Sequence, residues 1–150
     1  MRPRARPNVR QLIYITSVLP DLGQSHADAA GAGPAPWVHP RPDGTAVLRS
    51  DQLQELFFSD CDDDTFAEAL TRAAPQPLAA FGQPVRRVAW REVPSTYVVC
   101  AEDRAIPAAG QREHAAKSTH IVELACGHHP FLSQPEALAQ IIADAASLPR

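Results

Sequence analysis

Residues 96–101, TYVVCA, form a short apolar run of β-branched and aromatic character, and the polar turn EDR at 102–104 follows at once. A second run, IVELAC at 121–126, has the same character. Each run predicts a buried strand bounded by turn residues. The stretch between them starts with a proline suited to a first helical turn, so we expect a helix over residues 107–117.

A second helix is predicted after the second strand. The sequence SQPE at residues 133–136 matches a capping box with a proline in the first turn. One face of the helix would then carry Leu138, Ile141, Ile142 and Ala145. Strand, helix, strand and helix in this order favour a parallel sheet with crossover helices. The sequence therefore predicts the α/β fold class.

Two residues capable of chemistry stand where the predicted strands end. Asp103 follows the first strand and His128 follows the second, 128 − 103 = 25 residues later. Ligands gather at the carboxyl ends of parallel strands, and neighbouring strands lie ~4.8 Å apart. We expect the two side chains to meet, so that the carboxylate orients His128 as a general base. The alternative is that Asp103 only caps the following helix and His128 is a turn residue.

The first half of the chain is less regular. QLIYITSVL, at 11–19, is a nearly continuous apolar run and predicts a strand covered on both faces. Residues 20–47 are rich in Pro, Gly and Ala and predict mostly loop. Two helices are expected next, one with Ser50 as N-cap and one capped by Asp60 or Asp62. The second would have an apolar face made of Phe66, Ala69, Leu70 and Ala73.

The amino-acid composition is typical of some classes of protein and argues against others. The 150 residues are 45% hydrophobic and 21% charged, with a formal charge of −3, as in a globular domain. A nucleic-acid binder would have a basic balance, so no nucleic-acid partner is expected. No apolar run approaches the ~20 residues needed to cross a bilayer. No signal-peptide pattern follows the start, and we expect a cytoplasmic protein without a membrane partner.

Neither a cofactor nor a metal is predicted. The cysteines are odd in number and widely spaced, which favours buried apolar roles over disulfides for Cys100 and Cys126. The acidic run at 60–64 lacks the Gly turn and distal Glu of a calcium loop, and a helix N-terminus explains it better. No standard ligand spacing is formed by His114, His120, His128 and His129.

Three segments carry a family resemblance: RPNVRQLIYITSVLPDLGQS (6–25), PSTYVVCAEDRAIP (94–107) and VELACGHHPFLSQPEAL (122–138). They resemble the α/β-hydrolase superfamily, most of all the branch of plant methyl esterases, hydroxynitrile lyases and many bacterial esterase-like proteins. The first segment is similar to the sixth strand of that fold, and residues 20–93 are similar to its helical lid. The resemblance implies that residues 1–150 are a single C-terminal portion of an α/β-hydrolase domain.

The resemblance also implies roles for single residues. Asp103 matches the triad acid and His128 the triad base, and the preceding glycine favours His128 over His129. At position 129 the family often has Ser. Aromatic residues of the lid help to line an apolar substrate pocket in the family, although lid core is an equal explanation for each one here. These residues are Trp37, Phe57, Phe58, Phe81 and Trp90.

The nucleophile of the superfamily has no counterpart in this sequence. It sits in a G-x-S-x-G elbow between a strand and a helix, ahead of the acid and the histidine. The sequence GQSHA at residues 23–27 has the right order, but Pro20, Asp21 and Leu22 separate it from the end of the predicted strand at Leu19. An elbow needs its serine on the turn directly after the strand. We therefore expect Ser25 to lie in a lid loop.

Our functional hypothesis is carboxylic-ester hydrolysis by a Ser-His-Asp triad whose serine lies outside this chain, acting on a small apolar ester-like substrate. The alternative is a non-catalytic, truncated remnant that binds a small apolar ligand or a partner. Without the earlier strands of the whole fold, the 11–19 strand would expose an apolar edge. We therefore expect either a homodimer or a complementing N-terminal half.

Overall fold

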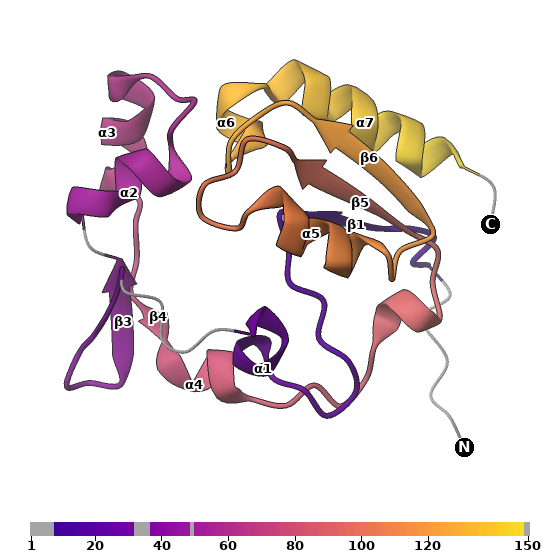
Figure 1. Cartoon of the computed structure of the whole chain (residues 1–150), viewed down its shortest axis with the longest axis horizontal. Helices are drawn as coiled ribbons and strands as arrows, with labels where there is room; N and C mark the ends of the chain where they lie inside the picture. Colours follow the sequence, from indigo (N-terminus) through magenta and orange to yellow (C-terminus); the bar gives the residue numbers. More distant parts are fainter. Residues whose placement is uncertain (1–7, 32–36, 49, 149–150) are drawn as a thin grey trace.

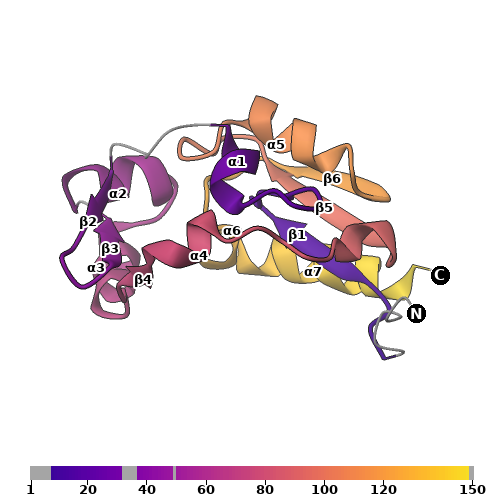
Figure 2. The same ribbon diagram turned by 90° about the horizontal axis from the view of Figure 1, so that it is seen from below.

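The computed structural model describes residues 8–31, 37–48 and 50–148, and a three-stranded parallel sheet lies at its centre (Figure 1). The sheet has the order β1-β5-β6, with β1 (Leu12–Ile15), β5 (Ser95–Cys100) and β6 (His120–Leu124). Figure 2 shows the sheet between two helices, α5 (Ala108–Ala115) and α7 (Pro135–Ser147). The predicted α/β class and its parallel strands are confirmed.

Strand β5 is the centre of the core because it has a partner strand on each side. All of its residues are buried, and the strand predicted over 96–101 is confirmed to within one residue. Tyr97 and Val99 pack with Leu19 and with Ala115 of α5. This packing fixes α5 against the sheet and therefore fixes the turn that connects them.

Strand β1 ends earlier than the sequence predicted. The expected strand over 11–19 stops at Ile15 because Thr16 has a φ of +46°, which is uncommon for a β-branched residue. The chain then turns away, and the hydroxyl of the buried Tyr97 donates to the backbone carbonyl of Ser17. The residues of β1 are only partly buried, so the expectation of a strand covered on both faces is wrong for the described residues.

Residues 20–93, called here the inserted segment, connect β1 to β5, and their described part lies beside the sheet (Figure 1). Their antiparallel sheet has the order β2-β3-β4, with β2 (Val38–Pro40), β3 (Thr45–Leu48) and β4 (Gln76–Pro77). Their helices are α1 (His26–Ala30), α2 (Ser50–Phe57), α3 (Asp63–Thr71), α4 (Leu78–Gly82) and the 3-10 turn η1 (Ala89–Arg91). The two predicted helices correspond to α2 and α3.

The region 20–47, predicted as mostly loop, contains a β-hairpin formed by β2 and β3. The turn between the strands is RPDG at 41–44, where Gly44 has a φ of +80° and donates to the carbonyl of Arg41. The Asp43 side chain accepts from the backbone N–H and the hydroxyl of Thr45. Pro-Asp-Gly is a turn signature with a physical basis, so this hairpin had a signal in the sequence.

The helix caps follow the predictions only in part. Asp62, and not Asp60, is the N-cap of α3 and accepts from the Thr65 backbone at 2.7 Å. The N-cap role predicted for Ser50 depends on a side chain that lies outside the described residues. On the predicted apolar face of α3, Phe66 and Ala69 are partly buried, whereas the other two residues, Leu70 and Ala73, are exposed.

The predicted capping box at 133–136 is wrong. Ser133 is the last residue of an additional short helix, α6 (Pro130–Ser133), so it cannot take the extended conformation of an N-cap. Gln134 precedes α7 instead, without a side-chain cap, and Pro135 opens the helix. At 13 residues α7 is the longest described helix. None of the helices in the described ranges is long and apolar enough to cross a membrane.

Replacing Tyr97 with Phe should lower the free energy of unfolding by about 1 kcal/mol, because the partly buried carbonyl of Ser17 loses its donor. Urea denaturation followed by circular dichroism measures this change. The matched control is Tyr14→Phe, since Tyr14 is only partly buried and its hydroxyl has no hydrogen bond within the described residues. The control should change stability by less than about 0.5 kcal/mol. Equal losses in both variants would contradict the assignment.

Candidate active site

Asp103 and His128 lie just beyond the carboxyl ends of β5 and β6, and the structure brings their side chains together. Nδ1 of His128 is 2.8 Å from Oδ2 of Asp103. The Asp103 side chain is fully buried, whereas 15% of the His128 side chain is exposed. A carboxylate can only accept a hydrogen bond, so this contact assigns the imidazole proton to Nδ1 and leaves Nε2 as an acceptor.

The Asp103 carboxylate is fixed by hydrogen bonds to both of its oxygens. Oδ1 accepts from the backbone N–H groups of Ala105 at 2.8 Å and Ile106 at 2.9 Å. Oδ2 accepts from Gln111 at 2.8 Å in addition to His128. These donors satisfy a buried charge and hold it in one orientation. The N-cap of α5 is Pro107, which has no side-chain cap, so Asp103 is not the cap of that helix.

Gln111 is a site residue that the sequence analysis missed. It is completely buried on α5. Its amide nitrogen donates to Asp103 and to the carbonyl of Ile106 at 2.7 Å, while its amide oxygen accepts from the Cys100 backbone at 2.9 Å. The signal was present, because Gln111 shares a helical face with Ala108 and Ala115. A polar residue on a buried face needs partners.

Thr16 connects the first strand to the histidine. Its hydroxyl is 3.4 Å from the backbone carbonyl of His128, which it faces as a donor. Its positive φ therefore occurs next to the candidate site, where strained backbone tends to cluster. The sequence held no signal for this conformation, because threonine is not a residue that favours it.

The aromatic residues singled out in the sequence have different surroundings. The Phe57 ring meets His128 edge-on, with centroids 4.9 Å apart, and Trp37 lies 6.1 Å from Phe57. Phe58 packs against His129 at 4.5 Å. The remaining two are away from the pair, since Phe81 contacts His26 and Trp90 packs on the core of the sheet. Phe57 and Trp37 therefore give the surroundings of His128 an apolar, aromatic character.

His129 is held neutral by its surroundings. Burial, with a smaller contribution from the adjacent His128, lowers its pKa to about 4. Its Nδ1 atom is buried and has no hydrogen-bond partner within the described residues. The ring instead packs among the aromatic side chains of Phe57, Phe58 and Phe131. In this arrangement His128, and not His129, is the partner of Asp103.

Neither Ser25 nor any of the three cysteines offers this pair an activated nucleophile. Ser25 is buried as the N-cap of α1, where its hydroxyl donates to the Asp28 carboxylate at 2.7 Å. Burial raises the pKa values of the Cys100 and Cys126 thiols, and it raises that of Cys61 together with nearby carboxylates. Thiols with raised pKa values stay protonated at neutral pH and are poor nucleophiles. Around this pair, the described residues thus show a buried carboxylate held against an imidazole.

Comparison with known proteins gives the class to which this chain belongs. The model of the alpha/beta hydrolase family matches residues 2–141, and the chain belongs to that family. It is 28% identical to the alpha/beta hydrolase nvfD of Aspergillus novofumigatus, over 96% of this chain and 60% of the relative. It is also 28% identical to the pyrethroid hydrolase of Sphingobium wenxiniae, over 94% of this chain and 56% of the relative.

Solved structures agree with the family assignment. A pyrethroid hydrolase structure matches with a TM-score of 0.76 and 25% identity, covering 94% of this chain and 62% of that one. The match to polyneuridine aldehyde esterase has a TM-score of 0.77 and 16% identity, and it covers 93% of this chain and 63% of that one. The match to a methylesterase from Arabidopsis has a TM-score of 0.73 and 17% identity, and it covers 93% of this chain and 59% of that one. Both proteins share the fold. The chain spans about 60% of the length of these relatives and has a partial α/β-hydrolase fold.

The neutral state of His129 predicts a pH dependence of stability. Below pH 6.5 the unfolded chain binds a proton at His129, whereas the folded chain does not until about pH 4. The free energy of unfolding should therefore fall as the pH drops from 7 to 5, by up to about 2 kcal/mol from this residue. Urea denaturation at several pH values measures the slope.

His129→Phe, which keeps an aromatic ring among Phe57, Phe58 and Phe131, should remove this part of the slope. The control is His120→Gln, because His120 is exposed at the start of β6 and lies outside this aromatic group. The control should keep the slope of the parent chain. An identical fall in stability for the parent and the His129→Phe variant would contradict the assignment of a buried neutral imidazole.

Proposed function

We propose that Asp103 and His128 are the acid and the base of a Ser-His-Asp triad that hydrolyses carboxylic esters, and that the serine lies outside these 150 residues. The observation that carries the proposal is the 2.8 Å contact between His128 Nδ1 and the buried Asp103 carboxylate. The relatives whose names describe hydrolases and esterases support the class of reaction. The order acid then histidine along the chain also agrees with this family.

In the proposed reaction His128 handles the protons. Its Nε2 accepts the proton of the serine hydroxyl as the serine oxygen bonds to the ester carbonyl carbon. When the tetrahedral intermediate breaks the bond to the alcohol, Nε2 returns that proton to the departing oxygen. Water then repeats both steps on the acyl-enzyme, which releases the acid and restores the serine. Asp103 holds the ring in the correct tautomer and stabilises the imidazolium throughout.

We assign this chain to the C-terminal portion of the hydrolase domain, with the inserted segment as its lid. Its coverage of about 60% of the relatives supports this assignment. Strand β1 pairs with β5, and within the described residues its other edge has no partner strand. That edge offers backbone groups to which further strands can add. The nucleophile and its strands would come from an N-terminal half, of the same or of a complementing polypeptide.

The substrate that fits these surroundings is a small apolar ester. Phe57 packs against His128, and Trp37 packs in turn against Phe57. Such rings favour apolar groups and offer no charged partner to a substrate carboxylate or amine. We therefore place an apolar acyl or alcohol group of the substrate beside Phe57.

The proposal predicts the kinetics of the native protein isolated from the cells that make it. Hydrolysis of a p-nitrophenyl ester should fall by about a thousandfold or more in kcat for both His128→Ala and Asp103→Asn. The matched control is Ser25→Ala, which should leave turnover unchanged because Ser25 caps α1. The circular dichroism spectra of the variants show whether each one remains folded.

Two outcomes would count against the proposal. Turnover that survives His128→Ala would remove the base from the reaction, and turnover lost in Ser25→Ala with a folded chain would place the nucleophile inside this sequence. Binding of an apolar ligand by the native protein without any turnover would instead favour the non-catalytic remnant.

A further inference from the structure

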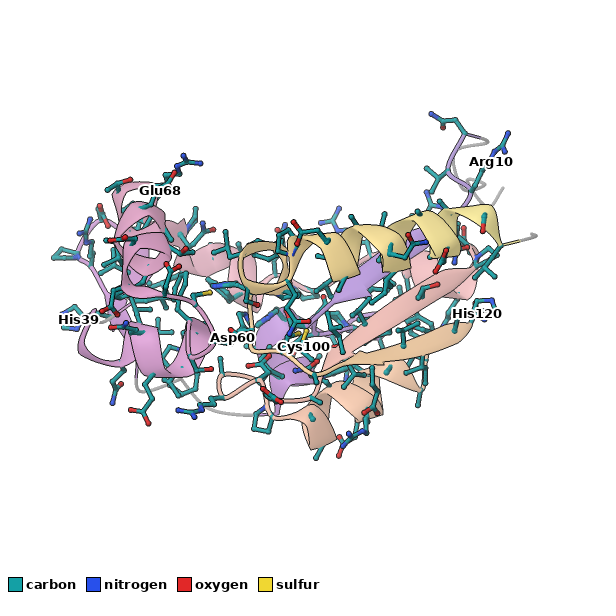
Figure 3. The ribbon with its side chains drawn as sticks, turned by 90° about the horizontal axis from the view of Figure 1, so that it is seen from above. Arg10, His39, Asp60, Glu68, Cys100 and His120 are labelled. Atoms are coloured by element: carbon teal, nitrogen blue, oxygen red, sulfur yellow. The ribbon has the colours of Figure 1, made fainter. Side chains whose placement is uncertain are left out.

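Asp60 belongs to the inserted segment, yet its side chain reaches the loop that carries His128. It lies in the turn between α2 and α3. Its Oδ2 accepts from the backbone N–H of Gly127 at 2.6 Å. Figure 3 shows Asp60 where the inserted segment meets the end of the sheet, near Cys100 at the end of β5. This is a polar contact between segments 67 residues apart in sequence.

The approach of Asp60 explains why residue 127 is a glycine. Gly127 does not have a positive φ, so the backbone conformation does not require glycine there. The limited space does require glycine, because a Cβ at this position would lie 2.8 Å from Cγ of Asp60 and still nearer to Oδ1. Backbone and carboxylate can come this close only without a side chain.

The burial of one Asp60 carboxylate oxygen is energetically unfavourable, and a role as helix cap does not account for it. The Oδ1 atom of Asp60 is buried and has no hydrogen-bond partner within the described residues. The neighbouring Asp62 already caps α3 from an exposed position. A buried carboxylate oxygen without a partner is unfavourable, so Asp60 is placed for its contact with Gly127 and not for the helix.

The residues just before Asp60 touch the same loop. Phe57 packs edge-on against the His128 ring, with centroids 4.9 Å apart, and Phe58 packs against His129 at 4.5 Å. The stretch from Phe57 to Asp60 therefore contacts each of the three residues of the 127–129 loop. The two aromatic contacts involve side chains, whereas the hydrogen bond to Gly127 fixes the backbone directly before His128.

We propose that Asp60 is a positioning residue that couples the inserted segment to His128. Its hydrogen bond to Gly127 holds the 127–129 loop in the position at which Nδ1 of His128 contacts Asp103. The catalytic meaning of this coupling rests on the function proposed for His128. The coupling itself is a property of the folded chain and is measurable without turnover.

The test uses NMR spectra of the 150-residue chain, with two readouts. One is the hydrogen-exchange rate of the Gly127 amide, and the other is the resonance of the His128 Nδ1 proton that Asp103 holds. In Asp60→Ala the Gly127 amide should exchange about tenfold faster or more, and the Nδ1 proton signal should be lost to exchange with water. A role confined to folding would leave the Nδ1 signal unchanged in a folded variant.

Two further variants serve as rescue and control. Asp60→Asn keeps an oxygen that accepts from Gly127, so it should retain the Nδ1 signal. Asp64→Ala removes an exposed acid from the first turn of α3 and should match the parent in both readouts. Parent-like exchange and a parent-like Nδ1 signal in folded Asp60→Ala would overturn the proposal, as would loss of the signal in Asp64→Ala.

If Asp60→Ala does not fold, the Gly127→Ala variant tests the role of Asp60 in its place. The added methyl group collides with the Asp60 carboxylate and should displace it, so the Nδ1 proton signal should weaken although Asp60 is still present. A folded Gly127→Ala variant with both readouts unchanged would overturn the proposal. A failure of the proposed esterase function would leave all these signals as predicted, because they report the loop and not the reaction.

Discussion

The hydrogen bond between His128 Nδ1 and Asp103 Oδ2 is the interaction on which the rest of the site depends. Burying the Asp103 carboxylate would be costly without donors. The turn after β5 supplies two backbone N–H groups, α5 supplies Gln111, and the loop after β6 supplies the histidine. The strand–helix–strand unit thus satisfies one buried charge from three elements, and this fixes the direction in which the imidazole faces.

The parts of this unit that could be predicted from sequence are those set by local patterns. The strands β5 and β6 follow from short β-branched runs, and the meeting of Asp103 and His128 follows from the geometry of adjacent parallel strands. Gln111 could have been inferred from a polar residue on an apolar helical face. The contact of Asp60 with Gly127 could not, because it joins distant segments and no local spacing encodes it.

Other differences have similar physical causes. Strand β1 ends at Ile15 because Thr16 has a backbone conformation that threonine rarely adopts, and Ser133 belongs to a short helix that displaces the expected cap. Ser25 and the three cysteines have surroundings that oppose nucleophilic chemistry. The histidine next to the base is kept neutral by burial. The carboxylate–imidazole pair of Asp103 and His128 therefore remains the group of described residues to which the proposed function assigns chemistry.

The central claim is that this base acts on a serine outside the 150 residues. Its most direct test is to treat the native protein, in extracts of the cells that make it, with a fluorophosphonate probe that labels activated serines, and to locate the adduct by mass spectrometry. The account predicts an adduct on a serine in additional sequence of a polypeptide heavier than 16.2 kDa, or in a polypeptide that co-purifies with this chain. An adduct on any serine within residues 1–150 would contradict it.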